Sequence, residues 1–238
     1  MARAESWARL NRLRFPDLPY DCGNAVDPGL IDSDHMRDWS RRPTTPDQYR
    51  IEAYLDRFDL RSKRILHIGV GNSGLAQRLH RRTKAIVGTT VDEAELEHAR
   101  ALGLPNYAVT LHNKYADGGE AVNGEFDFIV DNNPVSACCC ITHLAAVLDL
   151  FAAKLTEGGQ VVTDRHGLHW IAPGVHPQFR FDFDDLAATA PLAGLAAWRI
   201  DGNVHVLTRS GPPVKPDPAS RLRSFIRRAR ALPGRVLR

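Results

Sequence analysis

The fold is indicated by residues 64–74, Arg-Ile-Leu-His-Ile-Gly-Val-Gly-Asn-Ser-Gly. The first part is a short apolar run typical of a β-strand, and the glycines after it allow a sharp turn into a helix over 75–82. Such a turn lets a ligand approach the backbone, and the amides at a helix start favour a carboxylate or another anion. The stretch predicts a nucleotide-type cofactor site; the alternative is a tight turn without a ligand.

The flanking sequence continues this alternation of short apolar strands and helices. Strands are expected at 64–69, 85–89, 106–111, 126–131 and 160–164, and helices at 46–58, 75–82, 92–102, 141–155 and 182–190. Gly158-Gly159 is expected to end the long helix. Two last strands, 195–200 and 204–208, flank a hairpin turn. The prediction is an α/β fold: a Rossmann-like, seven-stranded, mostly parallel sheet with helices on both faces and an antiparallel final hairpin strand.

Composition fits one globular domain with extensions. The 238 residues are 43% hydrophobic and 25% charged, which argues against global disorder. No apolar stretch approaches the ~18 residues of a membrane span, and the N-terminus lacks an apolar signal core. Four cysteines, three of them adjacent, make a poor disulfide framework. A cytoplasmic location is therefore expected.

The ends of the chain differ from its centre in pattern and charge. Residues 1–43 show little periodicity and are predicted to form an irregular N-terminal arm, followed by the main domain at 44–210. Residues 211–238 carry eight basic residues and one acidic residue. They are predicted to form a linker and, over 219–238, an amphipathic helix suited to an anionic membrane surface, an acidic partner or its own domain, with no nucleic acid expected.

Four segments resemble the class I S-adenosylmethionine-dependent methyltransferases in their order and spacing. They are ILHIGVGNSG (65–74), VGTTVDEAELEHAR (87–100), FDFIVDNN (126–133) and LAAVLDLFAAKLTEGGQVV (144–162). The resemblance covers roughly residues 45–209 and implies S-adenosylmethionine as the cofactor. It also implies that the arm at 1–43 is a lid over the cofactor, with Tyr20, Trp39 and Tyr49 as the candidate lid aromatics. The activity it implies is methylation, and the acceptor expected here is a small molecule or a carbohydrate.

The resemblance also implies which residues hold the cofactor. The methionine half would lie by His67, Gly69, Gly71, Asn72, Ser73 and Gly74. The ribose would lie by Thr90 and Val91 with Asp92 in reach, the adenine around His112 and Asn113, and the sulfonium by Asp131 and Asn132.

Two positions depart from the family pattern. The family usually has a carboxylate where His67 stands and another at the end of the second strand, where this chain has Thr90. A hydroxyl offers one neutral hydrogen bond where a carboxylate offers two charge-assisted ones. These departures keep open a second hypothesis, a methyltransferase-like binding or scaffold protein with a degenerate cofactor site.

A nicotinamide dinucleotide is the competing cofactor, in an oxidoreductase. Gly69, Gly71 and Gly74 fit the G-x-G-x-x-G pattern of dinucleotide sites. That pattern also requires an acidic residue at the end of the second strand, and Thr89-Thr90 does not supply it. A closing hairpin also does not favour the second βαβ half that such an enzyme needs.

Candidate chemistry follows the fifth strand. Methyl transfer to an oxygen often needs a base, and histidine, with an ordinary pKa of about 6.5, suits that role. His166 is the first candidate and His169 the second, with Asp164 at the strand end beside them. The alternative is that both histidines are surface loop residues. Trp170 is either a substrate wall or part of the core.

Two groups of residues have metal-binding side chains, and neither is expected to bind a metal. Asp131 and Asp164 end neighbouring strands, as in Mg²⁺-dependent O-methyltransferases, but Arg165 stands beside the second carboxylate. Cys138-Cys139-Cys140 lacks a C-x-x-C spacing and has only the distant Cys22 as a further thiol, so a zinc site is not expected. We expect the three adjacent cysteines to pack as small buried residues under the sheet.

Overall fold

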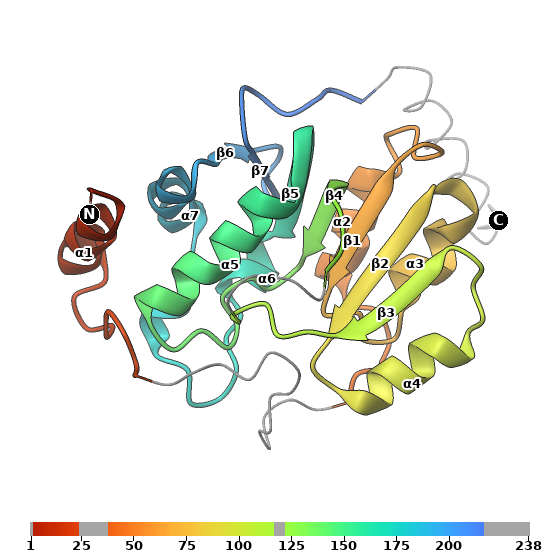
Figure 1. Ribbon diagram of the computed structural model, residues 1–238, viewed down its shortest axis with the longest axis horizontal. Helices are drawn as coiled ribbons and strands as arrows, with labels where there is room; N and C mark the ends of the chain where they lie inside the picture. The colour runs from red at the N-terminus through yellow and green to blue at the C-terminus, as the bar shows by residue number, and fades with distance from the viewer. Residues whose placement is uncertain (1, 24–37, 117–121, 217–238) are drawn as a thin grey trace, which may run out of the picture.

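The computed structural model describes residues 2–23, 38–116 and 122–216. A seven-stranded sheet forms its centre, in the order β3-β2-β1-β4-β5-β7-β6 (Figure 1). The strands are β1 (Arg64–Ile68), β2 (Ala85–Thr90), β3 (Tyr107–Leu111), β4 (Phe126–Asp131), β5 (Leu155–Asp164), β6 (Ala196–Arg199) and β7 (Val204–Thr208). The first five are parallel, while β7 runs antiparallel to β5 and β6 antiparallel to β7. This confirms the predicted fold class.

Helices cover both faces of the sheet. They are α1 (Ala2–Arg14), α2 (Pro46–Leu55), α3 (Gly74–Leu79), α4 (Glu93–Ala101), α5 (Ile141–Lys154), α6 (Arg165–His169) and α7 (Phe183–Thr189), with 3-10 turns η1 (His80–Arg82), η2 (Pro177–Phe179) and η3 (Ala190–Ala193). One core lies between the sheet and α1, α5 and α7, the other between the sheet and α2 and α3. Successive side chains of a strand point to opposite faces of the sheet and so contribute to both cores: Leu66 packs in the first and Ile65 in the second. None of the helices in the described part of the chain is long and apolar enough to span a membrane.

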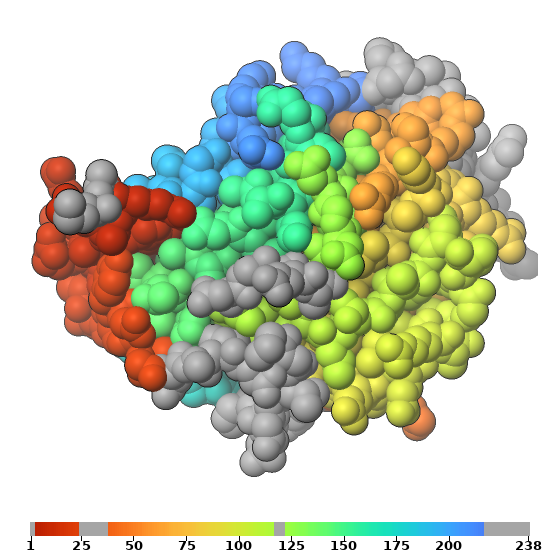
Figure 2. All heavy atoms as spheres, viewed as in Figure 1, coloured from red at the N-terminus to blue at the C-terminus, as the bar shows by residue number. Residues whose placement is uncertain are grey.

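The arm is not irregular throughout, because residues 2–14 form α1. Its Trp7 is buried in the first core, and Arg14 Nε donates to Asp185 on α7 at 2.6 Å. After α1 the chain runs along one end of the molecule beside α5 (Figure 2), where the amides of Ile141 and Thr142 donate to arm carbonyls. The helix is mostly polar and its apolar residues are hardly gathered on one side, which is why the sequence did not reveal it. The predicted tail at 219–238 lies outside the described residues.

The double glycine does not end the long helix. α5 stops at Lys154, and Leu155 is already extended, with φ −88° and ψ 128°. Gly158 and Gly159 lie inside β5, where the pairing with β4 shifts register between Phe126 and Phe128. Gly158 has a positive φ of 72°, so glycine is required by an irregular strand rather than by a helix terminus.

Candidate active site

The glycine-rich turn joins β1 to α3 through left-handed backbone. Gly69 and Gly71 have φ values of 73° and 50°, and Ser73 also has a positive φ, of 56°. Ser73 is buried, and its hydroxyl lies 2.9 Å from the hydroxyl of Tyr107 on β3. Residues other than glycine rarely adopt a positive φ, so the backbone at Ser73 is strained. The turn lies at the carboxyl ends of β1 and β2.

Several amides of this turn already donate hydrogen bonds to acceptors within the protein. Gly69 and Val70 both donate to the Thr89 carbonyl, at 2.9 and 3.1 Å, and Gly74 donates to Asn72 Oδ1 at 2.9 Å. A pyrophosphate is bound in dinucleotide sites by unoccupied amides at this position. The turn therefore does not favour a nicotinamide dinucleotide.

The end of the arm is bound to the turn by Asn72. Its Nδ2 donates to the Arg42 carbonyl at 2.7 Å and to Thr44 Oγ1 at 3.2 Å. A Cβ atom at Gly74 would lie only 2.5 Å from Thr44 Oγ1, so the glycine permits this close approach. Asn72, which the resemblance assigned to the methionine half of the cofactor, uses its side-chain amide to hold the arm.

A buried carboxylate that the sequence analysis missed lies beside the end of β2. Glu95, in the first turn of α4, accepts from the Thr90 hydroxyl at 2.6 Å and from the Trp39 amide at 3.1 Å. Burial raises the pKa of Glu95, and these two hydrogen bonds offset part of that rise. Asp92 does not reach past the helix end; it caps α4 by accepting the Glu95 amide at 3.1 Å. Val91 lies half-buried between them.

Buried polar atoms mark the carboxyl ends of four neighbouring strands. Among the described residues no partner is present for His67 Nδ1 on β1, Thr89 Oγ1 on β2, both ring nitrogens of His112 after β3, or Asn132 Oδ1 after β4. An unsatisfied buried polar group costs about 1–3 kcal/mol. Asn113 is also buried there and accepts a backbone amide at 3.1 Å. This row favours a polar ligand along the edge of the sheet.

His67 is neutral at neutral pH. Burial, with a smaller contribution from the charge of Arg78, lowers its pKa from 6.5 to about 4. The imidazole therefore supplies neither a positive nor a negative charge to a ligand. A carboxylate at this position would attract the amine of a bound amino acid, and His67 does not replace that charge.

Asp131 ends β4 as half of a buried ion pair. It is completely buried, and Lys114 Nζ lies 3.0 and 2.9 Å from its two oxygens and donates to the Asn133 carbonyl at 2.7 Å. Burial raises the pKa of Asp131, and the Lys114 ammonium opposes that rise. Lys114 was not recognised from the sequence, because only the fold brings the segment after β3 to the end of β4.

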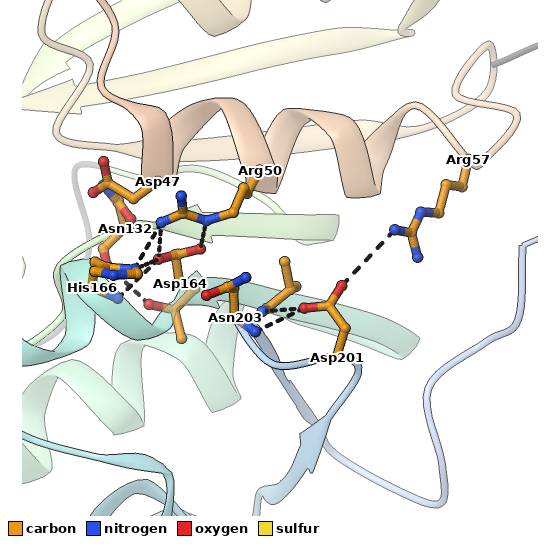
Figure 3. A network of polar contacts seen from close by, with 10 residues as sticks. Asp47, Arg50, Arg57, Asn132, Asp164, His166, Asp201 and Asn203 are labelled. Atoms are coloured by element: carbon orange, nitrogen blue, oxygen red, sulfur yellow. Dashed lines mark hydrogen bonds and ion pairs between the residues drawn. The ribbon is translucent and has the colours of Figure 1, made fainter. Parts of the chain in front are cut away.

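Asp164 ends β5 as half of a second ion pair (Figure 3). Arg50 on α2 forms a bidentate pair with it, with both N–O distances 2.8 Å. The pKa of Arg50 is raised, chiefly by this hydrogen-bonded pairing. Asp47, one turn earlier on α2, accepts from the side-chain amide of Asn132 after β4. Helix α2 thus closes over the ends of both strands.

These ion pairs do not favour the magnesium site considered from the sequence. β4 and β5 are hydrogen-bonded neighbours, so Asp131 and Asp164 do end adjacent strands as expected. Each carboxylate, however, is held by a basic side chain from another element, Lys114 or Arg50. A divalent cation would have to displace both of these cations or face their repulsion.

Both candidate bases lie on the short helix α6 rather than on a loop. The His166 amide donates to Asp164 Oδ1 at 2.9 Å, and its Nδ1 lies 2.9 Å from Arg50 Nη2 and 3.3 Å from Asp164 Oδ1. His169 is exposed at the end of α6, and Trp170 is 42% exposed, so it is not a core residue. Gly167 is required there, because a Cβ atom would lie 2.0 Å from the carbonyl oxygen of Asn132.

Comparison with known proteins identifies the fold. No family model and no curated protein matches the sequence. Among solved structures, a TehB-like SAM-dependent methyltransferase from Corynebacterium glutamicum aligns over 88% of this chain and 99% of its own, with 18% identity and a TM-score of 0.52.

Two further structures agree. The SAM-bound amino pentose methyltransferase CalS10 from Micromonospora echinaspora aligns over 76% of this chain and 100% of its own (15% identity, TM-score 0.54). The CcbJ methyltransferase from Streptomyces caelestis aligns over 75% and 100% (14% identity, TM-score 0.55). The chain thus has the fold of the class I S-adenosylmethionine-dependent methyltransferases.

Proposed function

We propose that the protein is an S-adenosylmethionine-dependent methyltransferase that methylates an oxygen of a small molecule or carbohydrate. The observation that carries the proposal is the row of unpartnered buried polar atoms at the carboxyl ends of β1, β2, β3 and β4. In open α/β sheets ligands bind at this edge, near the point where strand order reverses. CalS10, which shares the fold, is described as an amino pentose methyltransferase and was solved with SAM bound, which supports the substrate class and the cofactor.

The residues present fit such a cofactor, which supplies an electrophilic methyl group on a sulfonium. Thr90 and Glu95 together offer a hydroxyl and a carboxylate for the ribose at the end of β2. His112 and Asn113 offer buried polar groups for the adenine. The turn from Gly69 to Gly74, with His67 beneath it, forms the methionine half.

His166 is the proposed base, and its tautomer controls that role. In the structure its Nδ1 lies 2.9 Å from Arg50 Nη2, and because arginine only donates, Nδ1 accepts and Nε2 carries the proton. To take a proton from an acceptor hydroxyl at Nε2, the ring must instead carry its proton on Nδ1 and donate it to Asp164 Oδ1, now 3.3 Å away. Asp164 is then the positioning residue for the imidazole.

A binding or scaffold protein is the second candidate. It is favoured by neutral His67, which lacks the charge expected near the methionyl amine, and by turn amides that are occupied inside the protein. Isothermal titration calorimetry with S-adenosylmethionine and S-adenosylhomocysteine distinguishes the two. Binding of either compound supports the methyltransferase. If neither compound at millimolar concentration gives a heat of binding, the methyltransferase proposal is rejected and the binding or scaffold protein is supported.

The acceptor and the base are tested together. A radiolabelled methyl-transfer assay on small-molecule extracts should identify an acceptor, and mass spectrometry should show an O-methyl product. His166→Ala should then lower kcat by about 10²- to 10⁴-fold. His176→Ala is the matched control, since His176 is exposed and its ring caps η2 by accepting the Gln178 amide at 3.3 Å. Equal turnover in wild type and His166→Ala would retire His166 as the base.

A further inference from the structure

A cluster of four metal-binding side chains lies where the N-terminal arm meets the start of α5. Cys139 and Cys140 precede the helix, His143 is in its first turn, and Cys22 comes from the arm. The potential ligand atoms all lie within 4.8 Å of one another. The expectation that all three adjacent cysteines are buried is wrong for Cys139, which is exposed, and Cys22 is not distant in space.

The distances within the cluster are close to those of a tetrahedral site. Cys139 Sγ lies 3.3 Å from Cys22 Sγ and 2.9 Å from His143 Nδ1. His143 Nδ1 is also 3.2 Å from Cys140 Sγ and 3.6 Å from Cys22 Sγ. With Zn–S near 2.3 Å and Zn–N near 2.0–2.1 Å, tetrahedral geometry requires S–S and S–N separations of about 3.8 and 3.5 Å. An ion could enter with shifts of about 1 Å or less.

The chemistry of the ligands selects a soft divalent ion. Three thiolates and one imidazole are a Cys₃His set, which is typical of closed structural zinc sites. Three thiolates around one Zn²⁺ leave a net negative charge, and the amino end of the 14-residue helix α5 stabilises negative charge. Four protein ligands leave no open position for a substrate, so the ion would have a structural role.

We propose that Cys22, Cys139, Cys140 and His143 bind one structural Zn²⁺ that fastens the N-terminal arm to α5. The backbone already joins these segments next to the cluster: the Ile141 amide donates to the Pro19 carbonyl at 3.1 Å, and the Thr142 amide donates to the Tyr20 carbonyl at 2.9 Å. The ion would add a cross-link next to this pair of hydrogen bonds. It would join segments that are far apart in the sequence, since Cys22 and Cys139 are separated by 117 residues. None of these four residues is among the proposed cofactor contacts, and the proposal does not depend on the proposed activity.

Metal content tests the proposal directly. The full chain, produced without a metal-binding tag and purified with a non-thiol reductant, should contain about one zinc per chain by inductively coupled plasma mass spectrometry. Replacement by Co²⁺ should give the intense visible absorption of a tetrahedral thiolate site. Cys22→Ser should weaken Zn²⁺ binding at least as much as the loss of an outer-sphere partner, about 10- to 100-fold.

Cys138→Ala is the matched control. Cys138 adjoins the cluster in sequence, but its thiol donates to the Cys140 carbonyl at 3.3 Å and lies in the core. This variant should keep one zinc per chain and the Co²⁺ spectrum. Removing zinc from the wild type should also speed hydrogen exchange at the Ile141 and Thr142 amides, and should not do so in Cys22→Ser.

Three results would overturn the proposal. They are reduced protein with neither zinc nor a Co²⁺ thiolate spectrum, a Cys22–Cys139 disulfide in protein purified without reductant from a zinc-supplied cytoplasm, and unchanged zinc affinity in Cys22→Ser. The readouts are metal content, spectrum and exchange, so a failed methylation assay would not affect them.

Discussion

Two regions of this molecule differ from what their residues suggest about metal binding. One is the edge of the sheet with Asp131 and Asp164, called here the carboxylate edge, and the other is the cluster of Cys22, Cys139, Cys140 and His143. Asp131 and Asp164 carry hard ligands on adjacent strands, yet each is paired with a basic side chain of the same protein. Cys139 and Cys140 were expected to be packing residues, yet Cys22 and His143 lie beside them and complete a set of four potential metal ligands. The difference shows that a metal site depends on which groups the fold brings to the ligands, because a nearby cation removes a site and a distant thiol completes one.

The strongest test of the carboxylate edge is Lys114→Met. It leaves the completely buried Asp131 without its cation, and breaking a buried pair in this way costs about 3–5 kcal/mol. Urea unfolding should show this loss as a lower midpoint at unchanged m-value. The double variant Lys114→Met/Asp131→Asn should recover most of the lost stability. A loss below about 1 kcal/mol in the single variant would mean that the pair is solvated.

Acidification should give the next largest effect, through His67. Its folded pKa of about 4 lies below the ordinary 6.5, so the unfolded chain takes up a proton in this range while the folded protein does not. Stability contributed by the neutral ring is therefore present above pH 6.5 and is lost as pH falls toward 4, by up to about 3 kcal/mol. Urea titrations at several pH values in this range give the free energy of unfolding as a function of pH. This free energy should fall less steeply with decreasing pH in His67→Asn than in the wild type, and an equal fall in both would contradict the buried neutral imidazole.

Zinc should stabilise the chain by a smaller amount. Free Zn²⁺ at 100 times its Kd should add about 2.7 kcal/mol, and the same concentration should add only about 1.4 kcal/mol to a variant that binds tenfold more weakly. Thermal unfolding of the wild type, Cys22→Ser and Cys138→Ala, each with zinc and after chelation, measures this. The comparison with the carboxylate edge fails if Cys22→Ser responds like the wild type.

Magnesium should have the smallest effect of all. Because Lys114 and Arg50 hold both carboxylates, millimolar Mg²⁺ should change the free energy of unfolding by less than about 0.5 kcal/mol, the range of an ordinary surface change. Chelation should likewise leave methylation unchanged once zinc has been restored. A clear stabilisation by Mg²⁺ that is lost in Asp164→Asn would instead place a metal at this edge.

Much of the fold could be predicted because it depends on local pattern. The apolar strand at 64–69 and the alternation of strands and helices that follows it predicted the sheet, and the hairpin that ends at 204–208 predicted its reversed last strand. Two errors came from rules that apply locally but were overridden by packing. Gly158 serves an irregular strand rather than a helix end, and α1 forms on a weak stripe because Trp7 docks in the core.

The candidate site was only partly predictable. The placement of His166 beside Asp164 followed from their order after β5, but Arg50, Lys114 and Glu95 were not recognised. Arg50 comes from α2, and Lys114 from the loop after β3. No spacing in the sequence relates Arg50 to Asp164 or Lys114 to Asp131. The parallel sheet brings together strand ends that are far apart along the chain.

Hydrophobic period and turn residues, which act over a few positions, were enough for the sequence alone to determine the sheet, most of the helices that cover it and the glycine turn at residues 69–74. Tertiary structure alone determined the charge state of His67, the cations on Asp131 and Asp164, and the meeting of Cys22 with Cys139. The physical reason is range: burial and pairing energies depend on distances in space, and those are set only when the segments pack.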